Sequence, residues 1–582
     1  MTATEVSDFA HAASLTELRQ KRRLVVSVKG HTLCIFADGD RVHAVDNRCP
    51  HMGFPLHRGT VSDGMLTCHW HHARFDLCSG GTFDQWADEL RRYPVDVRGD
   101  EVYIDVTPRL DPVEHQRKRL RDGLERNIPL VLAKAAITLT EADPSGVDAF
   151  RAGIDFGVDR RGDGWGRGLT TLVSFMNLVP RLDQNDVAVA LYHGLADVAD
   201  EADVDPPRFP LEPLPETSAL PAELGRWFRR FVDVRDAEGA ERALVSIVRS
   251  GAPPSQLADI LFAAATDHRY LDFGHALDFT NKAFEALDVV GWDRAERVLG
   301  AVPAQIANAM RMEEENSWRH PVDLVDLLHT TFERLPEAIE ARSASRGGWN
   351  GRSAMVEVVL GDDAAATVEA LLQAIRDGAR AVELASAVSF AAVTRIARFP
   401  TTNEFGDWDT ALHTFTFASA VEQGLRRSAS RKLVRGVFDA AMSIYLDRFL
   451  NVPAARLPVA HSVLDPHTLL EELPALLDRQ QQVDESAELV VSYLAANGDP
   501  ARLVPVLGSA LVRENRNFHT IQCVEAAVRQ HDLLRGTEDA ALPLIAAARY
   551  LAAHATTTRS QRQTFDIARR LHRGERLYEE VA

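Results

Sequence analysis

Residues 48–81 read RCPHMGFPLHRGTVSDGMLTCHWHHARFDLCSGG, and this stretch constrains the fold more than any other part of the 582-residue chain. Cys49 and His51 are separated by one residue, and Cys68 and His71 by two, with sixteen residues between the pairs. Each pair fits one tight loop that supplies a thiolate and an imidazole. The glycines in both halves suit loops whose backbone N–H groups approach a bound metal group. The stretch therefore predicts a metal site held by two loops.

Two kinds of metal group use these ligand types. In a [2Fe–2S] cluster, two thiolates hold one iron and two neutral imidazoles hold the other, which raises the reduction potential above that of all-cysteine clusters. A single zinc ion also binds two Cys and two His. The spacing and the glycine-rich loops favour the cluster, and zinc is the alternative.

Segments typical of β-strands surround this motif, with turn sequences such as Asp38-Gly39-Asp40 between them. The predicted strands are Leu24–Val28, Thr32–Phe36, Val42–Val45, Arg91–Val97 and Val102–Val106. We predict a small antiparallel β domain over residues 16–106.

CPHMGFPLHRGTVSDGMLTCHWHHARFDL and RRYPVDVRGDEVYIDV resemble the Rieske family, in particular its soluble ferredoxin and nitrite-reductase-small-subunit type. The resemblance covers about residues 16–106 and implies a Rieske β fold with one [2Fe–2S] cluster per chain. The cluster ligands that it implies are Cys49, His51, Cys68 and His71.

The loops depart from the respiratory Rieske proteins at two positions. Phe54 and Trp70 stand where those proteins carry an additional cysteine in each loop. We therefore expect no disulfide between the loops. We also expect a reduction potential of about −150 mV, at the lower end of the Rieske range.

After a linker at residues 107–113 the sequence takes on a helical period. We predict an α-helical domain over residues 114–582, with a subdomain break near the glycine-rich residues 343–352. The expected fold class is therefore multidomain, an N-terminal all-β Rieske domain followed by a large all-α helical domain.

The segment ATDHRYLDFGHALDFTNKAFEAL is the strongest candidate for a second site. On one continuous helix His268, Asp272 and His275 would lie within about 60° of one another. Two imidazoles and a carboxylate are the ligands of many non-haem iron sites. The alternative is that Asp272 only orients His268 or caps a neighbouring helix, without any metal.

A second segment, RFPTTNEFGDWDTALHTFTFA, has a polar loop that leads to His413 on a predicted helix. This arrangement suits the wall of a substrate pocket, although a helix start capped by Asp409 explains it equally well. The candidate catalytic residues are His268, Asp272, His275 and His413, with a second iron as the candidate metal.

The segments LYHGLADVAD and DFGHALDFTNKAFEAL are similar to the helical questin-oxidase-like proteins. This similarity implies an oxidative role for the helical region and assigns no role to any single residue.

Composition excludes some classes of partner. A formal net charge of −19 argues against nucleic acid or an anionic membrane surface as a partner, and no apolar run reaches the roughly 20 residues that span a bilayer.

Five cysteines, odd in number and mostly near the N-terminus, indicate a metal site in a reducing compartment. We expect a cytoplasmic protein. Because no nucleotide-binding motif is present, a separate electron-donating reductase is also expected.

The favoured function is an iron–sulfur oxidoreductase. A Rieske cluster would transfer electrons to an oxygenase-like reaction on a small organic substrate in the helical domain. The alternative is a ferredoxin-type electron carrier or redox sensor whose helical region is a scaffold for a partner.

Overall fold

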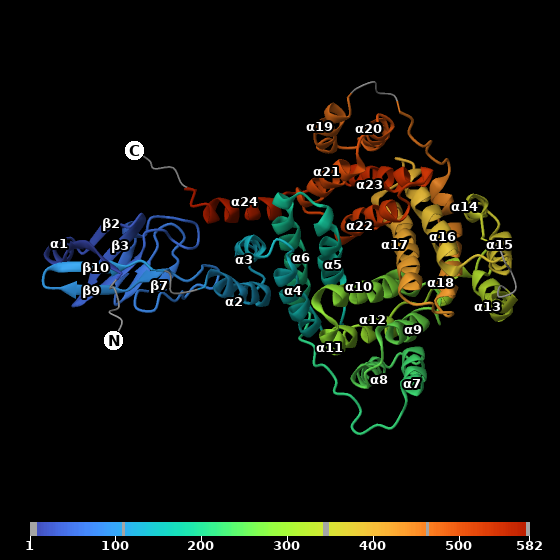
Figure 1. Ribbon diagram of the computed structural model, residues 1–582, viewed down its shortest axis with the longest axis horizontal. Helices are drawn as coiled ribbons and strands as arrows, with labels where there is room; N and C mark the ends of the chain where they lie inside the picture. Colours follow the sequence, from blue (N-terminus) through green and yellow to red (C-terminus); the bar gives the residue numbers. More distant parts are fainter. Residues whose placement is uncertain (1–7, 108–110, 342–347, 461–464, 578–582) are drawn as a thin grey trace, which may run out of the picture. The chain divides into compact units, whose positions relative to one another are not determined.

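The computed structural model describes residues 8–107, 111–341, 348–460 and 465–577 (Figure 1). It contains two compact units. The smaller unit comprises Met1–Ala142 together with Gln563–Ala582, and the larger unit comprises Asp143–Arg562. The predicted fold class is confirmed, because a β-sheet domain is followed by a large helical region.

The strands of the smaller unit form three antiparallel sheets, in the orders β1-β10-β9, β2-β3-β4-β8 and β5-β6-β7. The strands are β1 (Phe9–Ser14), β2 (Arg23–Val28), β3 (His31–Asp38), β4 (Arg41–Asp46), β5 (Thr60–Ser62), β6 (Met65–Thr67), β7 (Arg74–Asp76), β8 (Arg92–Tyr93), β9 (Val95–Arg98) and β10 (Glu101–Asp105). A short helix, α1 (Leu15–Lys21), follows β1.

Strand β3 lies between two apolar cores. Cys34 and Phe36 pack into the core beneath the β5-β6-β7 sheet, whereas Leu33 and Ile35 pack into the core shared with β1 and β10. Successive side chains of a strand point to opposite faces, so this one strand joins the two halves of the domain.

Three parts of the β domain differ from the sequence prediction. The short strands β5, β6 and β7 were not predicted. Strand β1 lies before residue 16 and pairs with β10, but its sequence FAHAAS is rich in alanine and lacks the branched residues that indicate a strand. The single strand predicted over Arg91–Val97 is divided at Pro94 into β8 and β9, because proline has no N–H group for a sheet hydrogen bond.

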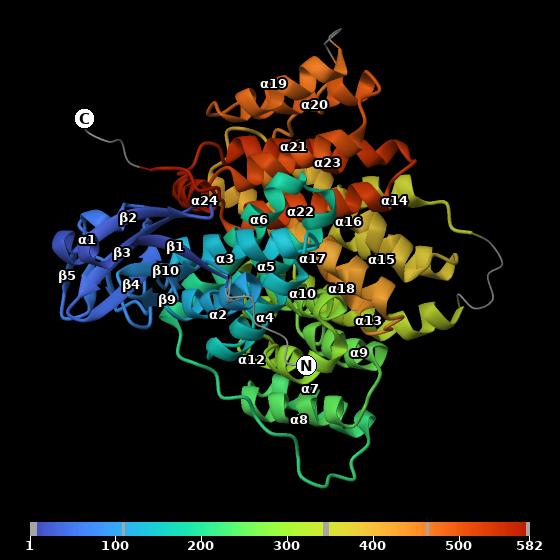
Figure 2. The same cartoon turned by 60° about the vertical axis from the view of Figure 1, so that its left-hand side comes forward.

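The smaller unit also contains helices. α2 (Pro112–Glu125) and α3 (Pro129–Ala142) pack against each other (Figure 2), and most of α24 (Ser560–His572) belongs to this unit. The predicted linker, residues 107–113, includes residues 108–110, which lie outside the described residues. The compact units divide after Ala142.

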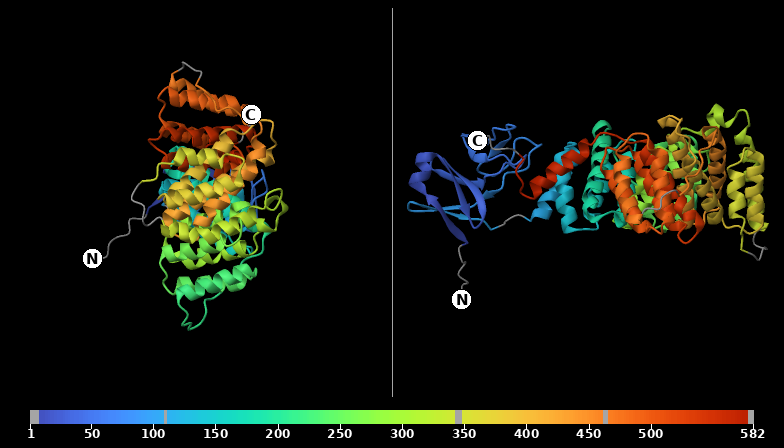
Figure 3. Two further views of the ribbon diagram at one scale, coloured as in Figure 1. Left: turned by 90° about the vertical axis from the view of Figure 1, so that its right-hand side faces the viewer. Right: turned by 90° about the horizontal axis from the view of Figure 1, so that it is seen from above.

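Helices of the larger unit lie side by side (Figure 3). They are α4 (Val147–Arg160), α5 (Arg167–Leu178), α6 (Gln184–Val204), α7 (Pro221–Asp233), α8 (Ala237–Arg249), α9 (Pro254–Ala265), α10 (His275–Val290), α11 (Ala295–Gly300), α12 (Pro303–Ala307) and α13 (Leu324–Ala341). They continue with α14 (Arg352–Val359), α15 (Ala364–Arg376), α16 (Ala381–Ala397), α17 (Phe405–Arg427), α18 (Val434–Leu446), α19 (Pro466–Leu477), α20 (Val483–Ala495), α21 (Pro500–Val512), α22 (Phe518–Leu533) and α23 (Ala541–Ala553).

Helices α10, α17, α22 and α5 pack together. α10 and α22 both pack against α17 and against α5. The subdomain break predicted near residues 343–352 falls largely on residues 342–347, which lie outside the described residues. Within the described segments, no helix combines the length and the apolar character that a bilayer crossing needs.

Candidate metal centres and a substrate cavity

The four predicted ligands of the smaller unit lie on two loops. The first ligand loop, residues 47–59, joins β4 to β5, and the second, residues 68–73, joins β6 to β7. The Cys49 N–H donates to the Phe54 carbonyl at 2.8 Å, and the Gly53 N–H donates back to the Cys49 carbonyl at 2.8 Å. Gly53 has a φ of +80°, which a residue with a Cβ rarely adopts.

The loops bring two thiols and two imidazoles together. Cys49 and Cys68 are 3% and 1% exposed, and their mutual hydrogen bond raises the pKa of Cys49 and lowers the pKa of Cys68 to about 6. The rings of His51 and His71 lie 4.9 Å apart at 82°. His51 is partly buried, whereas His71 is exposed.

These residues fit a [2Fe–2S] cluster. Burial, followed by the neighbouring His71, lowers the pKa of His51 to about 4, so its imidazole is neutral and able to bind a metal. The Nδ1 atom of His51 is buried and has no hydrogen-bond partner among the described residues. A bound iron would satisfy this nitrogen. Cys49 and Cys68 are both free thiols.

The second site differs from its prediction in one respect. The sequence predicts one helix through His268, Asp272 and His275, and this prediction is wrong: α9 ends at Ala265 and α10 begins at His275. The residues between them include three with left-handed φ angles, Tyr270 (43°), Asp272 (50°) and Phe273 (54°). The helical period therefore does not connect the three candidates.

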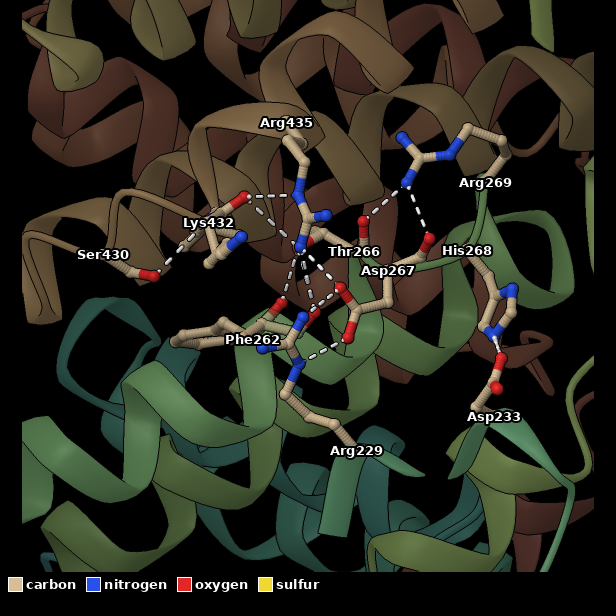
Figure 4. A network of polar contacts seen from close by, with 12 residues as sticks. Arg229, Asp233, Phe262, Thr266, Asp267, His268, Arg269, Ser430, Lys432 and Arg435 are labelled. Carbon is tan, nitrogen blue, oxygen red and sulfur yellow. Dashed lines mark hydrogen bonds and ion pairs between the residues drawn. The ribbon is translucent and has the colours of Figure 1, made fainter. Parts of the chain in front are cut away.

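His268 and Asp272 lie outside the cluster of histidines described below. Nδ1 of His268 lies 2.6 Å from Glu313 Oε1, and Nε2 lies 3.5 Å from Asp233 Oδ1. Figure 4 shows this side chain directed at Asp233. Asp272 is exposed. These contacts support a structural role for His268.

A polar network fixes the chain where α9 ends (Figure 4). Asp267 accepts hydrogen bonds from Arg229 of α7 at 2.5 Å and from Arg435 of α18 at 2.8 Å. Arg269 donates to the buried Asp439 at 2.7 Å. The paired charges hold the turn that sets the start of α10.

His275 and His413 do come together, and His519 joins them. The possible ligand atoms of the three residues, here called the histidine triad, all lie within 4.8 Å of one another. They come from the first turn of α10, the middle of α17 and the first turn of α22. Nε2 of His413 lies 2.9 Å from Nε2 of His519. Two nitrogens that each bind the same metal ion at about 2.1 Å are about this far apart when the N–metal–N angle is 90°.

A carboxylate lies behind the triad. Nδ1 of His519 lies 3.4 Å from Asp409 Oδ2, and Asp409 Oδ1 accepts a hydrogen bond from Tyr550. Burial acts to raise the pKa of Asp409, but the hydrogen bonds from His519 and Tyr550 hold it below its usual range. A carboxylate that orients a histidine in this way is typical of metal sites.

Burial also sets the protonation state of two members of the triad, His275 and His413. It lowers the pKa of His275 well below its usual range, and lowers the pKa of His413 to about 4, with His519 as a further cause for both. Neutral imidazoles are the form that binds a metal ion.

A cavity of about 440 Å³ borders the triad, and His413 forms part of its wall. Its polar groups include Asp447, whose pKa burial raises to about 7 and which accepts a hydrogen bond from Thr414 at 2.6 Å. The aromatic residues that line it are Tyr270, Phe273, Trp318, Tyr445 and Phe449. Polar residues such as Asp407, Thr410 and Arg448 complete the lining. A cavity that combines aromatic walls with polar groups suits a small organic molecule.

His519 was not among the predicted site residues. The signal was present, because His519, Gln522 and Glu525 recur every three residues on the helix FHTIQCVEAAVRQHDL. All three fall on the side of α22 that faces other helices, and Gln522 and Glu525 are buried. Polar residues on the buried side of a helix indicate a polar site.

Comparison with known proteins finds the Rieske [2Fe-2S] domain family at residues 9–94. The ferredoxin component of the naphthalene 1,2-dioxygenase system of Pseudomonas aeruginosa is 29% identical over 97 residues, which cover 16% of this chain and 93% of that protein. Apoptosis-inducing factor 3 of Homo sapiens is 35% identical over 68 residues, which cover 12% of this chain and 11% of that protein.

Among solved structures, the ferredoxin of carbazole 1,9a-dioxygenase from Nocardioides aromaticivorans IC177 is 26% identical, with a TM-score of 0.16. The match covers 17% of this chain and 98% of that one. The chain thus spans nearly the whole length of such ferredoxins but about a tenth of apoptosis-inducing factor 3.

Proposed function

We propose that this chain, whose residues 9–94 form a Rieske [2Fe-2S] domain, uses electrons received by that domain for an oxygenase-like reaction in its larger unit. The observation that carries the proposal is the histidine triad beside the cavity. Three possible metal ligands and a cavity of a size suited to an organic molecule adjoin each other there, in the same chain as the Rieske domain.

The ligand residues of the smaller unit would be Cys49, His51, Cys68 and His71. A Rieske cluster, when bound, accepts and donates one electron at a time. The two buried cysteines and the neutral His51 match that role.

We assign iron to the histidine triad. Three imidazoles also bind zinc or copper, but zinc has no redox chemistry and could not use an electron from the Rieske domain. His275 and His413 supply neutral nitrogens, and Asp409 orients His519.

The proposed reaction uses molecular oxygen and two electrons. One oxygen atom enters the organic substrate and the other leaves as water, with the uptake of two protons. The electrons come from a separate reductase, in line with a relative whose name describes it as the ferredoxin component of a dioxygenase system. We place the protein in the cytoplasm, where thiols stay reduced.

Iron analysis of three variants tests this proposal. Wild-type protein should bind about three iron atoms per chain, since a Rieske cluster accounts for two. Cys68→Ser should retain about one iron and His413→Ala about two. His329→Ala, which replaces an exposed histidine on α13, is the matched control and should equal wild type.

Two results would contradict the proposal. Cys68→Ser could contain no iron, or His413→Ala could contain as much as His329→Ala. Either would favour the alternative, an electron carrier or redox sensor with a helical scaffold, which the near-complete coverage of the ferredoxin relative also supports.

A further inference from the structure

Helix α3 contributes a lysine to the first ligand loop. Lys134 lies beyond residues 9–94 but within the same compact unit. Its Nζ donates a hydrogen bond to the Pro50 carbonyl at 2.5 Å and another to the His51 carbonyl at 3.3 Å. The side chain is only 14% exposed.

The two peptide groups that contain these carbonyls also interact with the cluster ligand Cys49, through their N–H groups. The Pro50 carbonyl shares its peptide group with the His51 N–H, and the His51 carbonyl shares its peptide group with the Met52 N–H. Both of these N–H groups donate hydrogen bonds to the Cys49 sulfur. Lys134 therefore binds the oxygen ends of two peptide groups whose nitrogen ends bind the sulfur.

Hydrogen bonds in series polarise one another. An ammonium group on the carbonyl oxygen withdraws electron density and makes the N–H of the same peptide group a stronger donor. Stronger N–H donors to a ligand sulfur, and a positive charge nearby, favour the reduced form of an iron–sulfur cluster, because reduction adds negative charge.

Neighbouring residues hold Lys134 in place. Asp88 lies 3.9 Å from its Nζ, and Arg119 of α2 donates to Asp88 at 2.6 Å and to the Ala87 carbonyl at 3.1 Å. Burial lowers the pKa of Lys134, while the negative charges of Asp88 and Cys49 act to raise it. Trp86, from the same segment as Asp88, has its ring 4.5 Å from that of His51.

We propose that Lys134 is a positioning residue that raises the reduction potential of the Rieske cluster by polarising the two peptide groups that donate to Cys49. The helices that follow the Rieske domain thus adjust its electron affinity. This role goes beyond the proposed reaction and depends on the cluster alone.

A redox titration of the full-length protein, followed by EPR of the reduced cluster, tests the role. Lys134→Met, which keeps the length of the chain and removes the charge, should have a lower midpoint potential than wild type. Lys134→Arg keeps a charged donor and should lie closer to wild type. Lys118→Met removes the same charge from an exposed position on α2 and is the matched control.

Equal midpoint potentials for Lys134→Met and Lys118→Met would overturn the proposal, because the position of Lys134 beside the first ligand loop would then have no effect on the cluster. If Lys134→Met fails to take up a cluster, Lys134→Gln replaces it, since glutamine keeps an N–H donor without the charge. A Lys134→Gln potential equal to that of Lys118→Met would likewise overturn it. Iron at the histidine triad should be the same in all these variants, so the outcome is independent of the proposed reaction.

Discussion

Individual side chains at both candidate metal sites are kept ready to bind a metal. Burial lowers the pKa of His51 and of His413 to about 4, so both imidazoles are uncharged at neutral pH. Burying a neutral histidine costs free energy, because its ring nitrogens lose their hydrogen bonds to water. A metal ion removes that cost.

Asp409→Asn should weaken iron binding at the histidine triad by about 10- to 100-fold, the usual effect of removing a carboxylate that orients a metal-binding histidine. Asn keeps the shape of the side chain and loses the charge that faces His519. The affinity can be measured by equilibrium dialysis in the Cys68→Ser background. Glu296→Gln, on α11, is the control, and equal affinities would contradict the assigned role.

Asp278→Asn should stabilise the larger unit at pH 8 and have little effect at pH 4. Burial raises the pKa of Asp278 to about 7, with Lys282 and Gln522 opposing this and Glu285 and Glu525 adding to it. A carboxyl with a raised pKa in the folded state favours folding at low pH, and this contribution is lost as the pH rises from about 4 to about 7 and above.

The difference between the usual pKa of 3.8 and about 7 corresponds to at most about 4 kcal/mol. Melting temperatures followed by circular dichroism at both pH values provide the measurement, with the exposed Asp288→Asn as control. An increase at pH 4 as large as that at pH 8 would refute the protonation argument.

Spacing and the family resemblance indicated some candidate site residues, but not the contacts that others make. Cys49, His51, Cys68 and His71 were accessible because each pair lies within one loop. The contacts of Lys134 and His519 could not be predicted, since the distance from Lys134 to His51, and from His519 to His413, is set by helix packing between segments far apart in the sequence. His275 and His413 were both predicted as candidates. They came from separate sequence patterns, and neither pattern predicted that the two side chains lie close together.

At the level of elements, the break between α9 and α10 determines the second site. Gly274 has a φ of +95°, and a Cβ there would lie 2.8 Å from the Phe417 Cβ. It directly precedes His275 and thus sets where α10 begins. The helical period across residues 268–275 concealed this break, because Tyr270 and Phe273 are not residues that usually adopt left-handed conformations.

Gly274→Ala should lower the melting temperature and weaken iron binding at the triad at least about tenfold, through a displaced His275. The backbone strain alone costs about 1–3 kcal/mol. Gly406→Ala is the matched control, because this helical glycine has open space around its Cβ position and a compatible φ. If both variants bind iron equally well, the break has no part in positioning His275.

For the molecule as a whole, the main feature is the return of the chain to its first unit. Residues 563–577 pack with residues 8–142, although the larger unit lies between them in the sequence. Arg48 of the first ligand loop donates a hydrogen bond to the Glu575 carbonyl at 2.5 Å, and His572 lies 2.7 Å from Glu141. No local sequence pattern indicates this return.

Phe565→Ala should destabilise the smaller unit by about 3–5 kcal/mol, since Phe565 of α24 is 1% exposed. The temperature at which the visible absorbance of the cluster disappears should therefore fall. Phe405→Ala, at a 63% exposed position, should leave it unchanged. A Phe565→Ala protein that bleaches at the wild-type temperature would show that α24 does not support the cluster domain.

Because the chain leaves the smaller unit after Ala142 and re-enters it at Gln563, two covalent connections run between the units. A protease that cuts either connection once leaves the other intact. The nicked protein should therefore migrate as two fragments under denaturing conditions and still elute as one species under native conditions.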